Sequence, residues 1–497
     1  MIYMRKGVWM VLLVPVFFLL SIMNPPICAG ITEEGKWKGN DSGVGPGGGF
    51  TKLGYAIEGS FNSDNDGLLE FVTTGIRSGT LRILLWEYNP SGGSGLIQAP
   101  GVGALWRGVE VVDLAVGDFD GDGYRDDLAI SYPMMSLGAT SNVGTISLYR
   151  GTSTGFSLWG SLTPGVTTTL PVPLASANLY WGWSIDAVGG DDRDYLLVGA
   201  PGFKVSNDDV GYAVLYSLEM GASGGIVGDV VWSQTGWRAG SRIREHNYGA
   251  CVRGLGDLNG DGEEDFGVSN LYNITPTIDG EGIHSDVHIY YRGSSTDVIW
   301  GTTQDYTDGV SPTYFGSSFD SGDFNGDGHL DLIIGEPCTS GTSSKVYIYA
   351  GSSSGIVTSN PAVSIVKGAI HFGVEVATIG DENGDNRDDF MVGAPLYDAT
   401  SGGNTYTDAG RVYVYEGAAT FSQIPNNNNW NKYGDTTNQY LGGSRITGNT
   451  FSFTGGKSLC GFLESVNGDQ KDDFAIGSPY YDTNSTTDAG CVWLYYG

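Results

Sequence analysis

The chain repeats one pattern seven times, in which an acidic loop rich in Gly and Asn runs into a short apolar strand. The most complete copies are DFDGDGYRDD from Asp118, DLNGDGEED from Asp257, DFNGDGHLD from Asp323 and DENGDNRDD from Asp381. The central Asp of each loop recurs at Asp66, Asp122, Asp191, Asp261, Asp327, Asp385 and Asp469. Self-similarity along the whole chain predicts a repeat fold.

Most repeats share an order of strand signals. A Gly-containing strand such as Phe315-Gly316 comes first, and the acidic loop follows. An apolar strand then ends in a turn, as in LIIGEP at 332–337, before an alternating strand such as KVYIYAG at 345–351. Alternation with many Tyr, Val and Ile is typical of strands, and Pro and Gly are typical of turns. Each repeat is therefore predicted to be a small antiparallel meander of about four strands.

One meander cannot bury both of its faces, whereas seven packed radially can. We predict an all-β fold, a seven-bladed β-propeller of four-stranded antiparallel blades over residues 30–497. The repeats are expected near residues 50–103, 104–175, 176–243, 244–310, 311–366, 367–450 and 451–497. The seventh repeat ends at Gly497 after its third strand, so residues near 31–38 are expected to supply the fourth strand and close the ring.

Composition agrees with a β repeat array and excludes other classes. Gly accounts for 80 of 497 residues, and aromatic residues for 12%, which is too many for a disordered chain. The formal net charge of −31 argues against binding of nucleic acid, which requires Lys and Arg to neutralise phosphates. Much of the negative charge lies in the repeated loops, where bound cations would cancel part of it.

The N-terminal segment has the features of a secretory signal. Arg5 and Lys6 precede an apolar stretch from Val8 to Met23, and Cys28-Ala29 ends a loose cleavage site. We expect residues 1–29 to be a signal peptide, with an uncleaved membrane anchor as the alternative. The protein is then secreted or displayed at the cell surface, where disulfides can form. Cys460 and Cys491 are either a disulfide within the last repeat, which we favour, or buried free thiols, and Cys251 and Cys338 are left without an assigned pairing.

The acidic loops have the oxygen spacing of calcium sites. Side chains at positions 1, 3 and 5 of a tight loop converge on one point, the position-7 carbonyl adds an oxygen, and position 9 closes the cage. Position 12, which is a bidentate Glu in an EF-hand, is here Ala129, Val268, Ile334 or Val392 inside a strand. A calcium loop within a β-hairpin is therefore expected, with the ion in a structural role. Polar turns without a cation are the alternative, because Asp, Asn and Gly are common in turns.

Four loops carry the complete pattern, and we expect each to bind Ca²⁺. The expected ligands are Asp118, Asp120, Asp122, Tyr124 and Asp126; Asp257, Asn259, Asp261, Glu263 and Asp265; Asp323, Asn325, Asp327, His329 and Asp331; and Asp381, Asn383, Asp385, Arg387 and Asp389. An extra residue in the first of these loops makes position 9 either Asp126, by counting, or Asp127, by strand register. We assign it to Asp126.

The remaining three loops are degenerate. Weaker calcium sites are expected at Asn62, Asp64, Asp66 and Glu70 in the first repeat, and at Asn467, Asp469, Lys471 and Asp473 in the last. The third repeat has Ala187, Gly189 and Tyr195 at positions 1, 3 and 9, so we expect no ion there.

Phe-Gly followed by Gly-Ala-Pro, with a calcium loop between them, resembles the FG-GAP repeats of the integrin α-subunit propeller. Phe372-Gly373 with Gly393-Ala394-Pro395 is the clearest pair, and Phe315-Gly316 with Gly335-Glu336-Pro337 departs at one position. The resemblance implies seven blades, calcium loops between the first two strands of a blade, and ligands bound on the opposite face. The von Willebrand-type domain and leg domains of an integrin α chain are not found in the sequence.

Motifs that suggest catalysis fit the repeats better. G-x-S-x-G occurs at 151–155, 221–225 and 351–355, but no helix pattern follows, as a hydrolase nucleophile elbow would require. We therefore expect a calcium-binding propeller, not an enzyme, that acts as an extracellular binding or adhesion module for a protein or glycan. The alternatives are a secreted polysaccharide-active lyase or hydrolase, and a structural component of the cell envelope.

Overall fold

The computed structural model describes 32–38, 50–51, 55–61, 70–77, 80–88, 96–99, 113–152, 156–164, 177–205, 208–220, 226–236, 246–272, 285–293, 296–300, 314–338, 344–368, 371–426, 428, 430–443, 457–462, 471–482 and 488–497. The expected signal peptide, residues 1–29, lies outside these ranges. Within them, no helix is long and apolar enough to cross a membrane.

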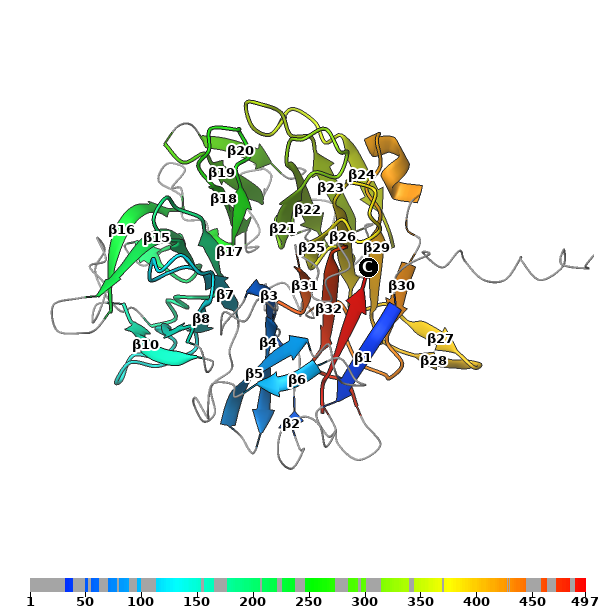
Figure 1. Cartoon of the computed structure of the whole chain (residues 1–497), viewed down its shortest axis with the longest axis horizontal. Coiled ribbons are helices and arrows are strands. Elements are labelled where there is room, and N and C mark those ends of the chain that lie inside the picture. The colour runs from blue at the N-terminus through cyan, green and yellow to red at the C-terminus, as the bar shows by residue number, and fades with distance from the viewer. Residues whose placement is uncertain are drawn as a thin grey trace, which may run out of the picture.

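Seven antiparallel sheets surround a common centre in chain order (Figure 1), which confirms the predicted all-β, seven-bladed propeller. The first sheet holds β2 (Phe50–Thr51), β3 (Ile57–Phe61), β4 (Glu70–Arg77), β5 (Thr80–Tyr88) and β6 (Leu96–Ala99). The second holds β7 (Leu114–Gly117), β8 (Asp127–Tyr132), β9 (Thr145–Arg150) and β10 (Ser157–Leu162). The third holds β11 (Ile185–Val188), β12 (Tyr195–Ala200), β15 (Tyr212–Met220) and β16 (Ile226–Thr235).

The other four blades have the same plan. The fourth holds β17 (His246–Gly256), β18 (Asp265–Tyr272), β19 (Asp286–Tyr290) and β20 (Thr296–Trp300). The fifth holds β21 (Phe319–Gly322), β22 (Asp331–Glu336), β23 (Lys345–Tyr349) and β24 (Val363–Val366). The sixth holds β25 (Val376–Gly380), β26 (Asp389–Ala394), β29 (Arg411–Tyr415) and β30 (Trp430–Tyr433). The seventh holds β31 (Leu459–Phe462), β32 (Asp473–Ser478), β33 (Cys491–Tyr496) and β1 (Thr32–Lys38).

The ring is closed by the strand nearest the N-terminus. β1 pairs antiparallel with β33, and Thr32 lies opposite Tyr496 while Lys38 lies opposite Cys491. Blue β1 therefore lies beside red β33 in Figure 1. This pairing agrees with the expectation that residues near 31–38 complete the last blade.

Two short hairpins and a 3₁₀ helix are inserted between the main strands of the blades. Two hairpins, β13–β14 (Lys204–Val205 and Asp208–Asp209) and β27–β28 (Ala399–Ser401 and Asn404–Tyr406), lie between the second and third main strands of their blades. A short 3₁₀ helix, η2 (Phe421–Asn426), precedes β30.

The hydrophobic core lies between neighbouring blades. Every residue of β8, β22, β26 and β32 is buried, because both faces of these second strands pack against an adjacent sheet. One cluster, for example, joins Ala56 and Val72 of the first blade to Leu114 and Leu128 of the second. Burial on both faces explains why these strands read as nearly continuous apolar runs.

The first strands of the seven blades contact one another in a ring around the axis. Each presents a free edge there, and carboxylates accept the N–H groups of that edge. Asp113 Oδ2 accepts from Ile185 N of the next blade (3.0 Å), and Asp186 Oδ2 accepts from Gly254 N (3.1 Å). Paired donors matter here because a buried N–H without an acceptor is costly.

The favoured disulfide between Cys460 and Cys491 is wrong. All four described cysteines are free. Cys460 on β31 and Cys491 on β33 are separated by β32, where they lie opposite Ala475 and Ser478. Cys460 packs with the first blade and Cys491 with the sixth, so the two thiols lie in different interfaces.

Candidate metal centre

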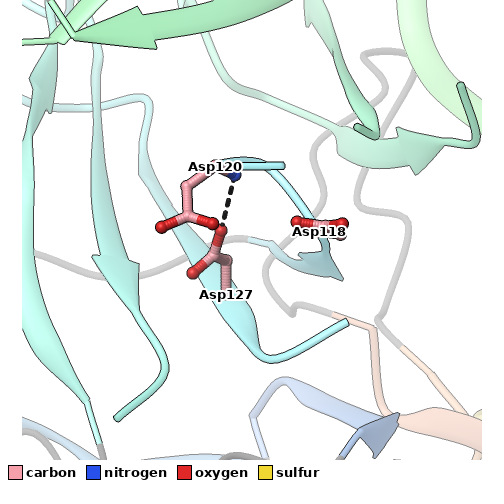
Figure 2. Close-up of side chains that lie close together, drawn as sticks. All are labelled: Asp118, Asp120 and Asp127. Atoms are coloured by element: carbon pink, nitrogen blue, oxygen red, sulfur yellow. Dashed lines mark hydrogen bonds between the residues drawn. The ribbon is translucent and has the colours of Figure 1, made fainter. Parts of the chain in front are cut away.

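The acidic loop of the second blade brings three carboxylates together. It connects β7 to β8, and one ligand oxygen each from Asp118, Asp120 and Asp127 lies within 4.8 Å of the others. Figure 2 shows the Asp120 and Asp127 side chains meeting, with Asp118 at the opposite side of the turn. Asp120 N donates to Asp127 Oδ2 (2.9 Å). Such a cluster supplies the hard oxygen ligands that Ca²⁺ takes.

The first Asp of the loop organises its turn. Asp118 Oδ1 accepts from the backbone N–H groups of Gly121 and Asp122, at 2.8 and 3.1 Å, and Asp118 Oδ2 accepts from Gly123 N at 2.9 Å. The turn requires φ of +77° at Gly121 and +92° at Gly123, which glycine adopts without strain. These local bonds explain the D-x-D-x-D-G spelling.

The same bonds recur in the three other complete loops. Asp257 accepts from Gly260, Asp261 and Gly262, and Asp323 and Asp381 accept from the corresponding residues of their own loops. In each loop the Asp at position 5 accepts from the N–H of position 7. The four loops therefore share one backbone conformation, in which the side chains of positions 1 and 5 are oriented alike.

Strand register assigns position 9 of the second-blade loop to Asp127. Asp265, Asp331 and Asp389 each begin the second strand of their blade, and each accepts an N–H from the second residue after the third strand. Asp127 likewise begins β8 and accepts from Gly151 N, which directly follows β9 (3.2 Å). This differs from our assignment to Asp126, because counting along the loop does not account for its extra residue.

The loop carboxylates repel one another. Burial raises the pKa of Asp127 to about 8, and the Asp120 and Asp126 carboxylates add to the effect. Burial likewise raises the pKa of Asp126 to about 7, with contributions from Asp122, Asp120 and Asp118. In the other loops, burial raises the pKa of Asp265 to about 6 and of Asp331 to about 7. A bound cation would offset both the desolvation and the repulsion.

One buried amide oxygen indicates that the loops fit a cation. Asn325 Oδ1, at position 3 of the fifth-blade loop, is buried and has no hydrogen-bond partner among the described residues. Its Nδ2 donates to Asp327 Oδ2 (3.0 Å), so the amide is oriented with its oxygen unused. A buried acceptor without a partner is costly, and a hard cation would satisfy it. The residues present therefore fit Ca²⁺.

Arginine side chains form ion pairs with carboxylates of these loops and offset part of their negative charge. Arg150 Nε lies 2.9 Å from Asp120 Oδ2, and its guanidinium stacks on Trp159. Arg387 pairs with Asp385, and Arg292 pairs with Glu263. The other oxygen, Asp120 Oδ1, accepts from Asp122 N (3.1 Å) and keeps a second lone pair, so the ion pair with Arg150 does not by itself block a cation.

The degenerate loops are only partly described. Asn62, Asp64, Asp66, Asn467 and Asp469 lie outside the described residues. Glu70 and Asp473 are buried at the first positions of β4 and β32, the register of Asp265. In the third blade Asp191 and Asp192 are exposed, and Tyr195 begins β12 where the other blades have a carboxylate.

Sequence reasoning missed the residue at position 8. Asp194, Asp388 and Asp472 each reach across to the loop of the preceding blade, where their Oδ2 atoms accept from Asp118 N, Asp323 N and Asp381 N. The available signal was a carboxylate preceded by a basic residue and followed by the second strand, as in Arg387-Asp388-Asp389 and Lys471-Asp472-Asp473.

The G-x-S-x-G motif that the structure describes forms a turn. Gly351–Gly355 lies between β23 and β24, and Ser352 Oγ donates to Gly355 O (2.7 Å). No helix follows it before β24, so it lacks the geometry of a nucleophile elbow. The other two copies include residues that the structure does not describe.

A family model for the FG-GAP repeat matches residues 111–149, 315–349 and 372–415. These segments span the acidic loop and adjoining strands of the second, fifth and sixth blades. The chain carries FG-GAP repeats in these three segments. Its repeats resemble those of the integrin α-subunit propeller, as the Phe-Gly and Gly-Ala-Pro motifs indicated.

Integrin α subunits are among the proteins whose sequences are similar to part of this chain. Integrin alpha-PS2 of Drosophila melanogaster is 29% identical over 37% of this chain and 12% of its own length. Integrin alpha-V of Gallus gallus is 28% identical over 48% of this chain and 22% of its own. Integrin alpha-3 of Mus musculus is 30% identical over 21% of this chain and 10% of its own. The match therefore spans less than a quarter of each of these relatives.

A solved structure titled "Structure of Dos1 propeller" aligns with 94% of this chain and 95% of its own, at 11% identity and a TM-score of 0.39. A likeness at this level supports no conclusion about function.

Proposed function

We propose that this protein is an exported FG-GAP propeller, secreted or held at the cell surface, that binds an extracellular protein or glycan and is stabilised by calcium. The observation that carries the proposal is the set of four loops with one conformation, in a chain that resembles integrin α propellers. Calcium is assigned a structural role because every loop joins the first two strands of a blade.

The ligand is proposed to bind on the face opposite the calcium loops. In an antiparallel meander, the connection between the second and third strands lies at the other end of the blade from the connection between the first and second. The second-to-third connections carry both inserted hairpins and the exposed apolar side chains of Met134 (40% exposed) and Leu137 (38%). Exposed apolar groups on these connecting loops favour a binding surface.

The test is an array of extracellular matrix proteins and glycans, probed with the purified chain in calcium and again in chelator. We expect one ligand class to be retained, with weaker binding in chelator because the ring is less stable. A double variant, Met134→Ser with Leu137→Ser, should weaken binding while leaving the melting temperature within a few degrees. Turnover of a polysaccharide would overturn the binding proposal in favour of an enzyme. Concentration-dependent self-association without any ligand would favour a structural role instead.

A further inference from the structure

Three acidic loops are joined to the following blade by a reciprocal pair of hydrogen bonds. Asp118 N donates to Asp194 Oδ2 (2.9 Å), and Asp194 N donates back to Asp118 O (2.7 Å). The pairs Asp323 with Asp388, and Asp381 with Asp472, repeat this arrangement at 2.7 to 3.2 Å. A residue of one blade thus fixes both backbone polar groups of the first ligand in its neighbour.

The pair between the second and third blades is informative because the third loop has no ligand set. Ala187, Gly189 and Tyr195 replace the oxygen-bearing side chains, and Asp191 and Asp192 are exposed. Asp194, unlike Asp191 and Asp192, is buried (7% exposed) and contacts the second blade. The one carboxylate of this loop that is buried therefore acts on another loop.

The contact is closely packed around Asp118. A Cβ atom added to Gly117 would lie 2.8 Å from Asp194 Oδ2, so glycine leaves the space that the carboxylate fills. Arg125 Nε lies 3.7 Å from the same oxygen. Asp118 in turn holds the turn through Gly121, Asp122 and Gly123. Its backbone position therefore sets where its carboxylate points.

We propose that Asp194 is a positioning residue for the calcium site of the second blade. The third loop binds no ion of its own and instead orients Asp118 across the blade interface. This inference rests on the proposed function, because it requires that the second-blade loop binds calcium. Asp388 and Asp472 have the equivalent role for the fifth and sixth blades.

The second-blade loop carries its own spectroscopic probe. Tyr124 stands at position 7 and is 48% exposed, whereas the other loops have Glu263, His329, Arg387 or Lys471 there. Tb³⁺ bound in place of Ca²⁺ would be sensitised by Tyr124, and a Tyr124→Phe control identifies that part of the emission. Titration with Tb³⁺, followed by displacement with Ca²⁺, therefore measures this one site in the full chain.

We expect Asp194→Ala to raise the Tb³⁺ concentration for half-saturation about tenfold, since a hydrogen bond to a charged group contributes about 1.5 kcal/mol or more. Asp194→Asn keeps an oxygen that can accept from Asp118 N and should restore most of the affinity. Asp192→Ala, an exposed carboxylate of the same loop, is the matched control and should match wild type. Asp388→Ala, which acts on the fifth blade, should also leave the Tyr124 signal unchanged.

The Tb³⁺ titration distinguishes a missing calcium site from a calcium site that Asp194 does not position. If wild type shows no Tyr124-sensitised emission, the second-blade calcium site fails and the inference fails with it. If wild type binds and Asp194→Ala stays within twofold of Asp192→Ala, only the inference is overturned. It is also overturned if Asp194→Asn is as weak as Asp194→Ala, because charge and not the hydrogen bond would then be responsible. Should Asp194→Ala not fold, Gly117→Ala displaces the same carboxylate and should weaken binding likewise.

Discussion

At the propeller axis, single carboxylates satisfy backbone donors on the free edges of the inner strands. Asp113, Asp186 and Asp320 each accept from the N–H of their own following residue and from an N–H of another blade. Two basic side chains lie among these acidic groups: Arg253, near Asp186 and Asp320, and Lys457, paired with Glu58. The inner strands are thus joined by carboxylates, and burying these charged groups costs free energy of desolvation.

The first prediction concerns Asp113. Burial raises its pKa from 3.8 to about 7, against the lowering effect of Lys457. The folded state then holds a proton that the unfolded state releases, so the free energy of unfolding falls as pH rises from about 4 to about 7. Asp113→Asn should remove that fall, which is at most about 4 kcal/mol. Urea unfolding of both proteins from pH 4 to 8, in excess calcium, measures the difference. Parallel pH profiles would contradict the prediction.

Glu375 provides a second prediction at this scale. Its carboxylate accepts from Ser458 N (2.6 Å), Ser458 Oγ (2.8 Å) and Leu459 N (2.6 Å), which joins the sixth blade to the seventh. Glu375→Ala should lower the free energy of unfolding by about 2–4 kcal/mol, because buried donors lose their acceptor. Chemical denaturation is the measurement. The exposed Glu219→Ala control should change stability by less than about 0.5 kcal/mol, and an equal effect of the two variants would refute the role of Glu375.

At the scale of the element, the acidic loop with its following strand is readable from sequence because its bonds are local. Asp323 and the N–H groups that it accepts lie within five residues, so spacing alone predicts them. Position 9 of the second-blade loop needed the pairing of β8 with β9, which counting does not supply. Asp194 and the separation of Cys460 from Cys491 depend on which blades are neighbours, and no local pattern encodes that.

Loss of one complete loop should have a limited and calcium-linked effect. Asp323→Ala removes a ligand and the acceptor of three N–H groups, so its stabilisation by 10 mM calcium should be lower than that of wild type by about 1.4 kcal/mol, for a site with a dissociation constant near 1 mM. Melting with and without calcium gives this difference. Asp191→Ala, in the loop expected to bind no ion, should leave calcium stabilisation unchanged. Equal losses in the two variants would mean that the third loop binds calcium too.

At the scale of the whole molecule, the first and last blades of the propeller are joined as neighbours. β1 pairs with β33, and first-strand contacts run from β3 through β31 and back to β3. The radial arrangement, including the use of residues near 31–38 to finish the last blade, could be predicted because repeat count and strand order are global properties of the sequence. The ligand could not be predicted from the sequence, because the repeats specify the scaffold and not the surface that the scaffold presents.

The last prediction follows from that closure. Because the blades share their interfaces, the stabilisation from each calcium loop should add to a single cooperative transition. Four sites of about 1 mM affinity contribute about 6 kcal/mol in 10 mM calcium. A propeller of this size has an unfolding entropy of about 1 kcal/mol/K, so chelation should lower the melting temperature by about 6 °C. Calorimetry with excess EGTA against 10 mM calcium, with magnesium as the control, measures the shift. A melt unchanged by chelator would leave the acidic loops as polar turns, and two separate transitions would mean that the blades do not unfold together.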